Sequence, residues 1–214
     1  LEEQEQLDQL KHFWKQYGNA ITWALIVFLG AFGGWNFYQY WQRSQAAQAS
    51  AMYDEMTRVV KSNDAAKIDR VFADMKDKFG ATTFAQQAGL LVAKQYYSAG
   101  NVDAAKLALT WVADKSSDPG YQAIAKLRLA GVLMESKAFD DALKQLSGNF
   151  PADFEALVAD RNGDIYVLQG KKAEALVEYA KSFKRFDEGT QYRRLVEVKM
   201  NALGVDPQST SQNP

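Results

Sequence analysis

Ala20–Tyr38, with the sequence AITWALIVFLGAFGGWNFY, is the stretch that decides the fold. Thr22 and Asn36 are its only clearly polar residues, and no charged side chain occurs between Lys15 and Arg43. As an α-helix the stretch extends about 28 Å, which is close to the hydrocarbon thickness of a bilayer. Backbone groups in lipid must be hydrogen-bonded within the segment, so the stretch predicts one transmembrane helix.

The flanks of this stretch are typical of the aromatic belts at membrane–water interfaces. Trp14 and Tyr17 precede the apolar run, and Trp35, Tyr40 and Trp41 lie at or beyond its end. A core helix of a soluble protein is the alternative, but such a helix usually carries a polar stripe for the solvent, and this run has none. We therefore expect a membrane anchor.

A cleaved signal peptide is the second alternative, because Ala47-Gln48-Ala49 offers an A-x-A cleavage pattern. That pattern lies well beyond the apolar run, and the run is longer than the usual hydrophobic region of about 7–15 residues. Four of the first eight residues are also acidic, whereas a signal peptide begins with basic residues. We expect the helix to be retained.

Basic residues near the ends of a span mark its cytoplasmic side. Lys11 and Lys15 precede the span closely, and only Arg43 follows it closely. We therefore expect residues 1–19 to form a cytoplasmic tail, residues 20–42 to cross the membrane, and the rest of the chain to lie outside.

Composition after the span excludes some classes of function. After Arg43 the chain carries 22 Lys or Arg and 22 Asp or Glu, so this part is formally neutral and has no overall field to attract DNA or RNA. The absence of cysteine means that no disulfide holds the fold. The first residue is not methionine, so we expect a trimmed start.

After the span, the pattern predicts helix after helix with short polar breaks. Ser44–Lys61 and Ala65–Lys78 form a first pair, separated by Ser62-Asn63-Asp64, whose side chains can cap the second helix. Gly80 is expected to end that helix at the position that favours a left-handed conformation.

A last helix is predicted near Thr190–Leu203, where it would cover the end of a helical array. Its expected buried face consists of Leu195, Val198 and Ala202. The remaining residues, 205–214, are polar and are expected to be disordered.

An internal repeat occupies the middle of the chain, in three copies offset by 37 and 33 residues. In each copy an alanine follows a polar break, and a small residue lies twelve positions before that alanine. One large residue lies three positions after the small residue, and a second large residue lies four positions after the alanine. In that order the sets are Ala105, Ala142 and Ala175; Ala93, Ala130 and Gly163; Tyr96, Leu133 and Tyr166; and Leu109, Leu146 and Tyr179.

This spacing predicts helical hairpins of the tetratricopeptide type. Small side chains on both helices let the backbones approach, and the larger side chains fill the space beside them. The turn needs a residue that tolerates positive φ, which Gly100 and Gly170 supply and Lys137 replaces in the middle copy. An array of hairpins without true repeats is the alternative.

A search for catalytic chemistry finds no motif. The only histidine is His12, in the tail before the span, and no glycine-rich phosphate-binding motif occurs. Asp140 and Asp141 are interpreted as a solvated pair at the start of a helix. We predict no catalytic, cofactor-binding or metal-binding residues, no cofactor and no small-molecule substrate.

One segment comes close to a calcium loop. Asp160, Asn162 and Asp164 supply oxygen atoms at the first, third and fifth positions. Ile165 stands where the loop needs glycine, and Lys171 stands where it needs a bidentate glutamate. The sequence therefore does not predict calcium binding.

The chain resembles the ancillary SecYEG translocon subunit family, the YfgM-like group of bacterial inner-membrane proteins. The resemblance rests on the acidic leader, on residues 10–18 (LKHFWKQYG), on one glycine-containing span that ends in aromatic residues, and on the repeats. It implies an inner-membrane anchor with the N-terminus in the cytoplasm and the helical domain in the periplasm. It also implies association with the SecYEG translocon and with the periplasmic chaperone PpiD.

The predicted fold class is all-α, with a single N-terminal transmembrane helix and a tetratricopeptide-like domain over residues 43–204. The predicted function is that of a non-enzymatic adaptor or co-chaperone that aids the handling of newly translocated proteins. One alternative is a scaffold for other envelope complexes, such as those of outer-membrane assembly or division. A membrane-bound hydrolase with carboxylate chemistry is the alternative from another class.

Overall fold

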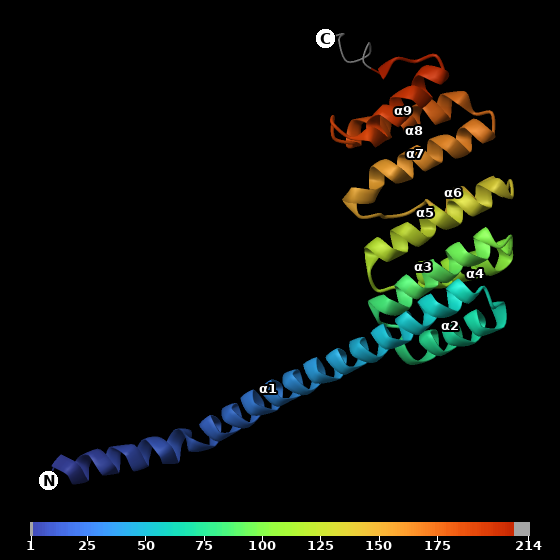
Figure 1. Cartoon of the computed structure of the whole chain (residues 1–214). Helices are drawn as coiled ribbons and strands as arrows, with labels where there is room; N and C mark the ends of the chain where they lie inside the picture. Colours follow the sequence, from blue (N-terminus) through green and yellow to red (C-terminus); the bar gives the residue numbers. More distant parts are fainter. Residues whose placement is uncertain (1, 208–214) are drawn as a thin grey trace, which may run out of the picture. The chain divides into compact units, whose positions relative to one another are not determined.

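Helix α1 runs without interruption from Glu2 to Ser62 in the computed structural model of the chain (Figure 1). The structure describes the backbone of residues 2–207 and the side chains of residues 11–207. The chain divides into a first unit that ends at Gln48 and a second unit that begins at Ala49. Residues of α1 therefore belong to both units, and the helix predicted for Ser44–Lys61 is the last part of α1.

The apolar side chains of the first unit are exposed. Trp23 is 67 % exposed and Val27 is 66 % exposed, and the stretch long and apolar enough to cross a membrane buries none of its residues within the chain. A core helix of a soluble protein would hide these side chains, so that alternative is wrong. Exposed apolar surface on all sides of a helix fits a lipid environment.

The second unit is a stack of helices that follow one another in chain order (Figure 1). Within the described residues no strand occurs, which confirms the all-α prediction. After α1 the helices are α2 (Ala65–Phe79), α3 (Thr83–Ser98), α4 (Val102–Lys115), α5 (Pro119–Glu135), α6 (Phe139–Gln145), α7 (Ala152–Leu168), α8 (Lys172–Arg185) and α9 (Gln191–Ala202).

Three hairpins in this stack match the three predicted repeats. They pair α3 with α4, α5 with α6, and α7 with α8. Their turns are alike: Gly100, Lys137 and Gly170 have φ values of 79°, 57° and 73°. In each turn the next backbone N–H donates to a carbonyl five residues earlier, as from Asn101 to Tyr96 over 2.8 Å. Lys137 thus adopts the left-handed conformation that the two glycines supply elsewhere.

The small residues of the repeat lie where the two helices of a hairpin touch. Ala105, Ala142 and Ala175 are completely buried. Gly163 makes the closest approach, because a Cβ atom there would lie 2.4 Å from Cε1 of Tyr179. The predicted pairing of small with large residues therefore sets the spacing within each hairpin.

The first two helices of the second unit differ from prediction in one detail. Asp64 caps α2 as expected, since its side chain accepts a hydrogen bond from the backbone N–H of Lys67. Gly80 follows α2 but has φ −54° and ψ −26°, so the predicted left-handed ending is wrong. The chain turns instead at Thr82, whose side chain caps α3 by accepting from the N–H of Ala85.

The buried face of α9 is not the one that the sequence pattern suggested. Leu195 and Val198 are 47 % and 62 % exposed, and Ala202 is exposed as well. Val196 and Met200 are buried instead, at 0 % and 4 % exposure. The helix carries two apolar stripes, and its contacts with the preceding hairpin select the one that contains Val196.

The turn after α9 repeats the hairpin turn. Gly204 has φ 83°, and the N–H of Val205 donates to the carbonyl of Met200 over 3.1 Å. Val205 also packs against the apolar cluster that contains Tyr179. Of the tail expected to be disordered, residues 208–214 lie outside the described residues.

Candidate protein-binding groove

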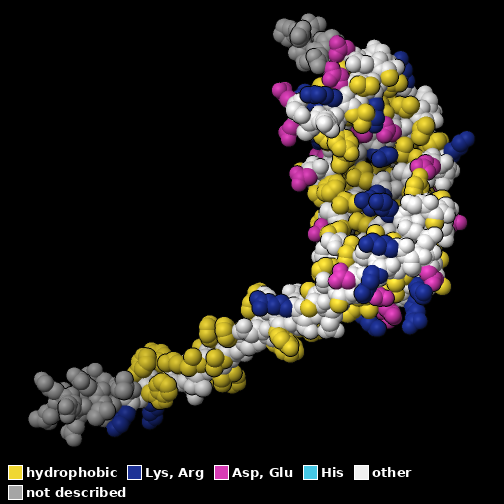
Figure 2. Space-filling model, viewed as in Figure 1, with side chains coloured by type: hydrophobic (Ala, Val, Ile, Leu, Met, Phe, Trp, Pro, Cys, Tyr) yellow, Lys and Arg dark blue, Asp and Glu magenta, His cyan; other side chains and the backbone are white. Residues whose placement is uncertain are grey.

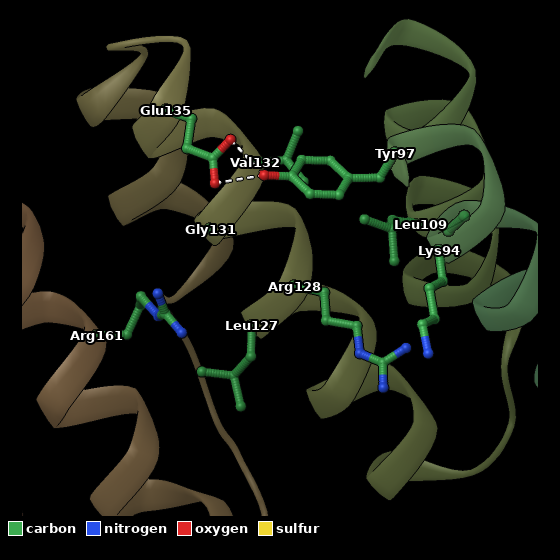
Figure 3. Close-up of a pocket in the computed structure, with 10 residues that line it drawn as sticks. Lys94, Tyr97, Leu109, Leu127, Arg128, Gly131, Val132, Glu135 and Arg161 are labelled. Atoms are coloured by element: carbon green, nitrogen blue, oxygen red, sulfur yellow. Dashed lines mark hydrogen bonds between the residues drawn. The ribbon is translucent and has the colours of Figure 1, made fainter. Parts of the chain in front are cut away.

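A groove of about 490 Å³ lies along the first helices of the hairpins, between α3 and α5 (Figure 3). We refer to it as the α3–α5 groove. Its lining residues come from four helices: Ala93, Lys94 and Tyr97 of α3, Leu109 of α4, Leu127, Arg128, Gly131, Val132 and Glu135 of α5, and Arg161 of α7.

The repeat architecture places an apolar floor in this groove. Leu109 and Val132 are buried, and Leu127 is half-buried. Leu109 is the large residue of the first repeat, and it reaches the floor because the small Ala93 lets α3 and α4 approach. A floor of aliphatic side chains between two helices is a common docking surface for a peptide.

Three basic side chains border this floor. Lys94 and Arg128 are exposed, and their charged ends point toward each other in Figure 3. Arg161 is half-buried and reaches the groove across α5, since a Cβ atom on Gly131 would lie 3.8 Å from its Nη1 atom. Among the side chains of residues 11–207, no carboxylate forms an ion pair with any of the three.

The wider surface shows the same pattern. In Figure 2, Lys and Arg side chains lie one above another along the stacked helices, with hydrophobic side chains around them. The second unit has no net charge after Arg43, so this arrangement is a local feature and not the result of a basic domain. A local row of positive charge favours a partner with negative charge.

One end of the groove is tied by a side-chain bridge. The Tyr97 hydroxyl lies 2.6 Å and 2.5 Å from the two carboxylate oxygens of Glu135, to which it donates (Figure 3). This hydrogen bond raises the pKa of Tyr97, because the carboxylate stabilises the protonated phenol. The bridge joins α3 to α5 and places the one carboxylate of the groove at this end.

A second bridge joins the same two helices farther along. Gln87 Nε2 donates to the Tyr121 hydroxyl over 2.8 Å, and both groups are partly buried. Since α3 and α5 are connected by two bridges that lie well apart along each helix, the width of the groove is set before any partner arrives. A preformed groove costs less ordering on binding than a flexible one.

The near-miss for a calcium loop is an ion-pair cluster. Lys199 Nζ of α9 donates to Asp160 over 2.8 Å and to Asp164 over 2.8 Å, and the Tyr179 hydroxyl donates to Asp164 over 2.7 Å. Burial raises the pKa of Asp160, although the neighbouring ammonium group opposes that shift. These carboxylates hold α9 on α7, which leaves them occupied rather than open to a metal ion.

Other candidate groups do not converge. Within residues 11–207, no three side chains of His, Asp or Glu are grouped so as to hold a metal ion. Asp140 and Asp141 are exposed in the first turn of α6, and His12 is exposed on α1 in the first unit. The pair Asp140 and Asp141 also lies outside the α3–α5 groove.

Sequence reasoning did not find the groove residues. Lys94, Arg128 and Arg161 are far apart in the chain, and each looks like an ordinary solvated charge. One signal was present: Arg128 and Arg161 both stand two residues before the small residue of their repeat, Ala130 or Gly163. Superposing the repeats would have placed those two on the same face of consecutive first helices.

Comparison with known proteins gives consistent matches over nearly the whole chain. Residues 11–205 match the family model described as tetratricopeptide repeat-like domain. An ancillary SecYEG translocon subunit of Neisseria gonorrhoeae is 30 % identical over 204 residues, which cover 95 % of this chain and 98 % of that protein. No solved structure matches the chain.

Two further relatives have the same name. The ancillary SecYEG translocon subunit of Haemophilus influenzae is 32 % identical, with 95 % of this chain and 98 % of the relative covered. The protein of that name from Escherichia coli is 27 % identical, with 95 % and 97 % covered. These matches include both the apolar part of α1 and the stacked helices.

Proposed function

The chain belongs to the ancillary SecYEG translocon subunit family, and from this premise we propose that it works beside the Sec translocon as a membrane-anchored adaptor. The observation that carries the proposal is the extent of the likeness, which covers the anchor and the helical domain together. The helical repeats alone occur in many unrelated proteins. The combination of an apolar helix, α1, with these repeats is the more specific feature.

The proposed topology has the N-terminus in the cytoplasm and the second unit in the periplasm. Lys11 and Lys15 before the span outnumber the nearby Arg43 after it, which favours this orientation. Because α1 continues from the apolar stretch to Ser62, the first residues of the second unit would emerge from the bilayer as a helix. The domain would then stand close to the exit side of the channel.

The proposed task is to aid the handling of newly translocated proteins, in association with the periplasmic chaperone PpiD. The chain would act by contact, as a co-chaperone, and not by catalysis. Support comes from the α3–α5 groove, which combines an apolar floor with basic borders and is preformed. Such a surface suits transient binding of protein segments, in which apolar contact gives affinity and charge gives selectivity.

Affinity purification of the tagged full chain from membranes tests this function. Mild detergent extraction should recover SecYEG and PpiD with the chain, and the same procedure applied to an unrelated single-span protein should not. Recovery of outer-membrane assembly or division proteins without SecYEG would contradict the proposal and support the scaffold alternative.

A further inference from the structure

The α3–α5 groove has an uneven distribution of charge along its length. Tyr97 and Glu135 occupy one end, where the carboxylate already accepts from the phenol. Lys94 and Arg128 point toward each other at the other end, away from that bridge (Figure 3). Two like charges that converge repel each other unless an anion lies between them.

Basic residues elsewhere in the second unit show what a structural role looks like. Lys199 bridges two carboxylates of α7, and Arg185 of α8 lies 2.7 Å from Glu155 of α7. Each of these contacts ties neighbouring helices together. Lys94 and Arg128 make no such contact with any described carboxylate, so the fold does not use their charges.

Arg161 extends the basic border to a third helix. It starts on α7, and the missing side chain at Gly131 leaves its guanidinium group room beside α5. Its planar group suits bidentate binding of a carboxylate. The three cations thus come from three successive first helices, α3, α5 and α7.

We infer that the α3–α5 groove binds an extended acidic segment of another protein, with carboxylates facing Lys94, Arg128 and Arg161 and apolar side chains on the floor of Leu109, Leu127 and Val132. This rests on the proposed function, from which it takes the role in protein binding and the membrane topology. An extended chain advances about 3.3 Å per residue, so carboxylates a few residues apart can face cations on successive helices.

The two terminal segments of the sequence do not fit this role. Residues 208–214, QSTSQNP, contain neither aspartate nor glutamate. The acidic residues of the leader precede the span and lie on the other side of the membrane in the proposed topology. A partner region with acidic residues alternating with apolar ones satisfies both features of the groove.

A binding experiment on the full chain in detergent tests this. The probe is a fluorescent peptide of about ten residues with glutamate at every third position and leucine or alanine between. A second peptide has glutamine in place of each glutamate. We expect the glutamate peptide to bind, measured by fluorescence anisotropy, with an affinity that falls as salt rises. We expect the glutamine peptide to bind about three- to a hundredfold more weakly.

Two triple variants locate the site. Lys94→Gln, Arg128→Gln and Arg161→Gln together should weaken binding by about three- to a hundredfold, the combined effect of three exposed charge pairs. The matched control carries Lys106→Gln, Lys144→Gln and Lys184→Gln on the second helices α4, α6 and α8, which removes the same net charge. This control should bind like the wild type.

Three results would overturn the inference. They are equal loss of binding in both triple variants, equal binding of the two peptides, and displacement of the glutamate peptide by vesicles of anionic lipid, which would make the groove a headgroup site. Circular dichroism of both variants shows whether they keep their helices. The assay contains no translocon, so its failure would leave the association with SecYEG untouched, and failure to recover SecYEG would leave peptide binding untouched.

Discussion

The contact between Gly163 and Tyr179 yields a quantitative prediction about the repeat. In the first two repeats the small residue is an alanine and the large residue of the second helix is a leucine. These pairs are Ala93 with Leu109 and Ala130 with Leu146. The third places Gly163 against the larger Tyr179, whose side chain is buried. If side-chain size sets the hairpin spacing, Gly163→Ala should be tolerated only when Tyr179 becomes smaller.

The magnitude follows from the geometry. An added Cβ atom at Gly163 would lie 2.4 Å from Cε1 of Tyr179, whereas carbon atoms are in good contact at about 3.5–4.0 Å, so the ring must move by about 1 Å. Overpacking of this kind costs about 1–3 kcal/mol. Replacing glycine by alanine within a helix returns about 1 kcal/mol, which partly hides that cost.

Gly131→Ala is the matched control. Gly131 also lies within a first helix, but a Cβ atom there meets only Arg161 Nη1 at 3.8 Å, an ordinary contact. Its variant should gain about 1 kcal/mol from helix propensity alone. Gly163→Ala should therefore have a free energy of unfolding about 1–3 kcal/mol below that of Gly131→Ala, measured by urea titration of the full chain in detergent with far-UV circular dichroism.

A double-mutant cycle with Tyr179→Leu completes the test. Leucine recreates the packing of Leu109 and Leu146, so Gly163→Ala in that background should no longer destabilise, and the coupling energy should be about 1–3 kcal/mol. Tyr179→Phe keeps the ring but removes the donor to Asp164, and here Gly163→Ala should still destabilise. Additive effects in the leucine background, or equal stabilities of the Gly163 and Gly131 variants, would refute the reasoning.

Three further predictions concern other parts of the chain. Lys137 and Gly170 both have positive φ, which glycine adopts at lower cost than other residues. Lys137→Gly should therefore raise the free energy of unfolding by about 1 kcal/mol, and Gly170→Ala should lower it by a similar amount. Unchanged midpoints in urea titrations would contradict this. Burial raises the folded-state pKa of Asp160, so above about pH 4 the folded chain holds more protons than the unfolded chain, and this carboxyl's contribution to stability falls as pH rises. Asp160→Asn should therefore gain stability relative to wild type as pH rises above about 4 in urea titrations, and a constant difference would argue against it. Because the chain has no cysteine, Lys144→Cys should react with an impermeant maleimide in spheroplasts and His12→Cys only after permeabilisation, and the reverse pattern would invert the topology.

The hairpins could be predicted because their determinants are local. Each turn needs one residue with positive φ, and the small and large residues stand at fixed distances from it. Lys137 shows the strength of this spacing, since a lysine takes the left-handed conformation where the other copies have glycine. The Ala138 N–H donates to the Leu133 carbonyl over 2.9 Å, so this turn has the same hydrogen bond as the two turns that contain glycine.

The orientation of α9 could not be predicted because it depends on another helix. Leu195 and Val198 have helical spacing, and so do Val196 and Met200. Val196 and Met200 pack in the cluster that contains Tyr179, and Lys199 beside Met200 reaches Asp160 of α7. When a helix has two apolar stripes, the sequence pattern predicts the helix correctly but does not show which stripe is buried.

The net charge of the chain did not predict how charges are distributed over its surface, because that distribution also depends on contacts between helices. Equal numbers of basic and acidic residues after Arg43 exclude a strong overall field, but they do not determine how charges pair. Tyr96 donates to Asp69 and Lys199 bridges two aspartates, so several carboxylates are occupied by neighbouring helices. Each carboxylate held in this way keeps its charge but is fixed in position, so it does not move to pair with a cation elsewhere.

The α3–α5 groove retains positive charge as a consequence. Its one carboxylate, Glu135, accepts from Tyr97 at the end away from Lys94 and Arg128. Salt screens the attraction between exposed charges over about 8–10 Å at physiological ionic strength. An acidic segment would therefore sense these cations only once it lies in the groove, so a neutral domain can select partners by charge without attracting every anion around it.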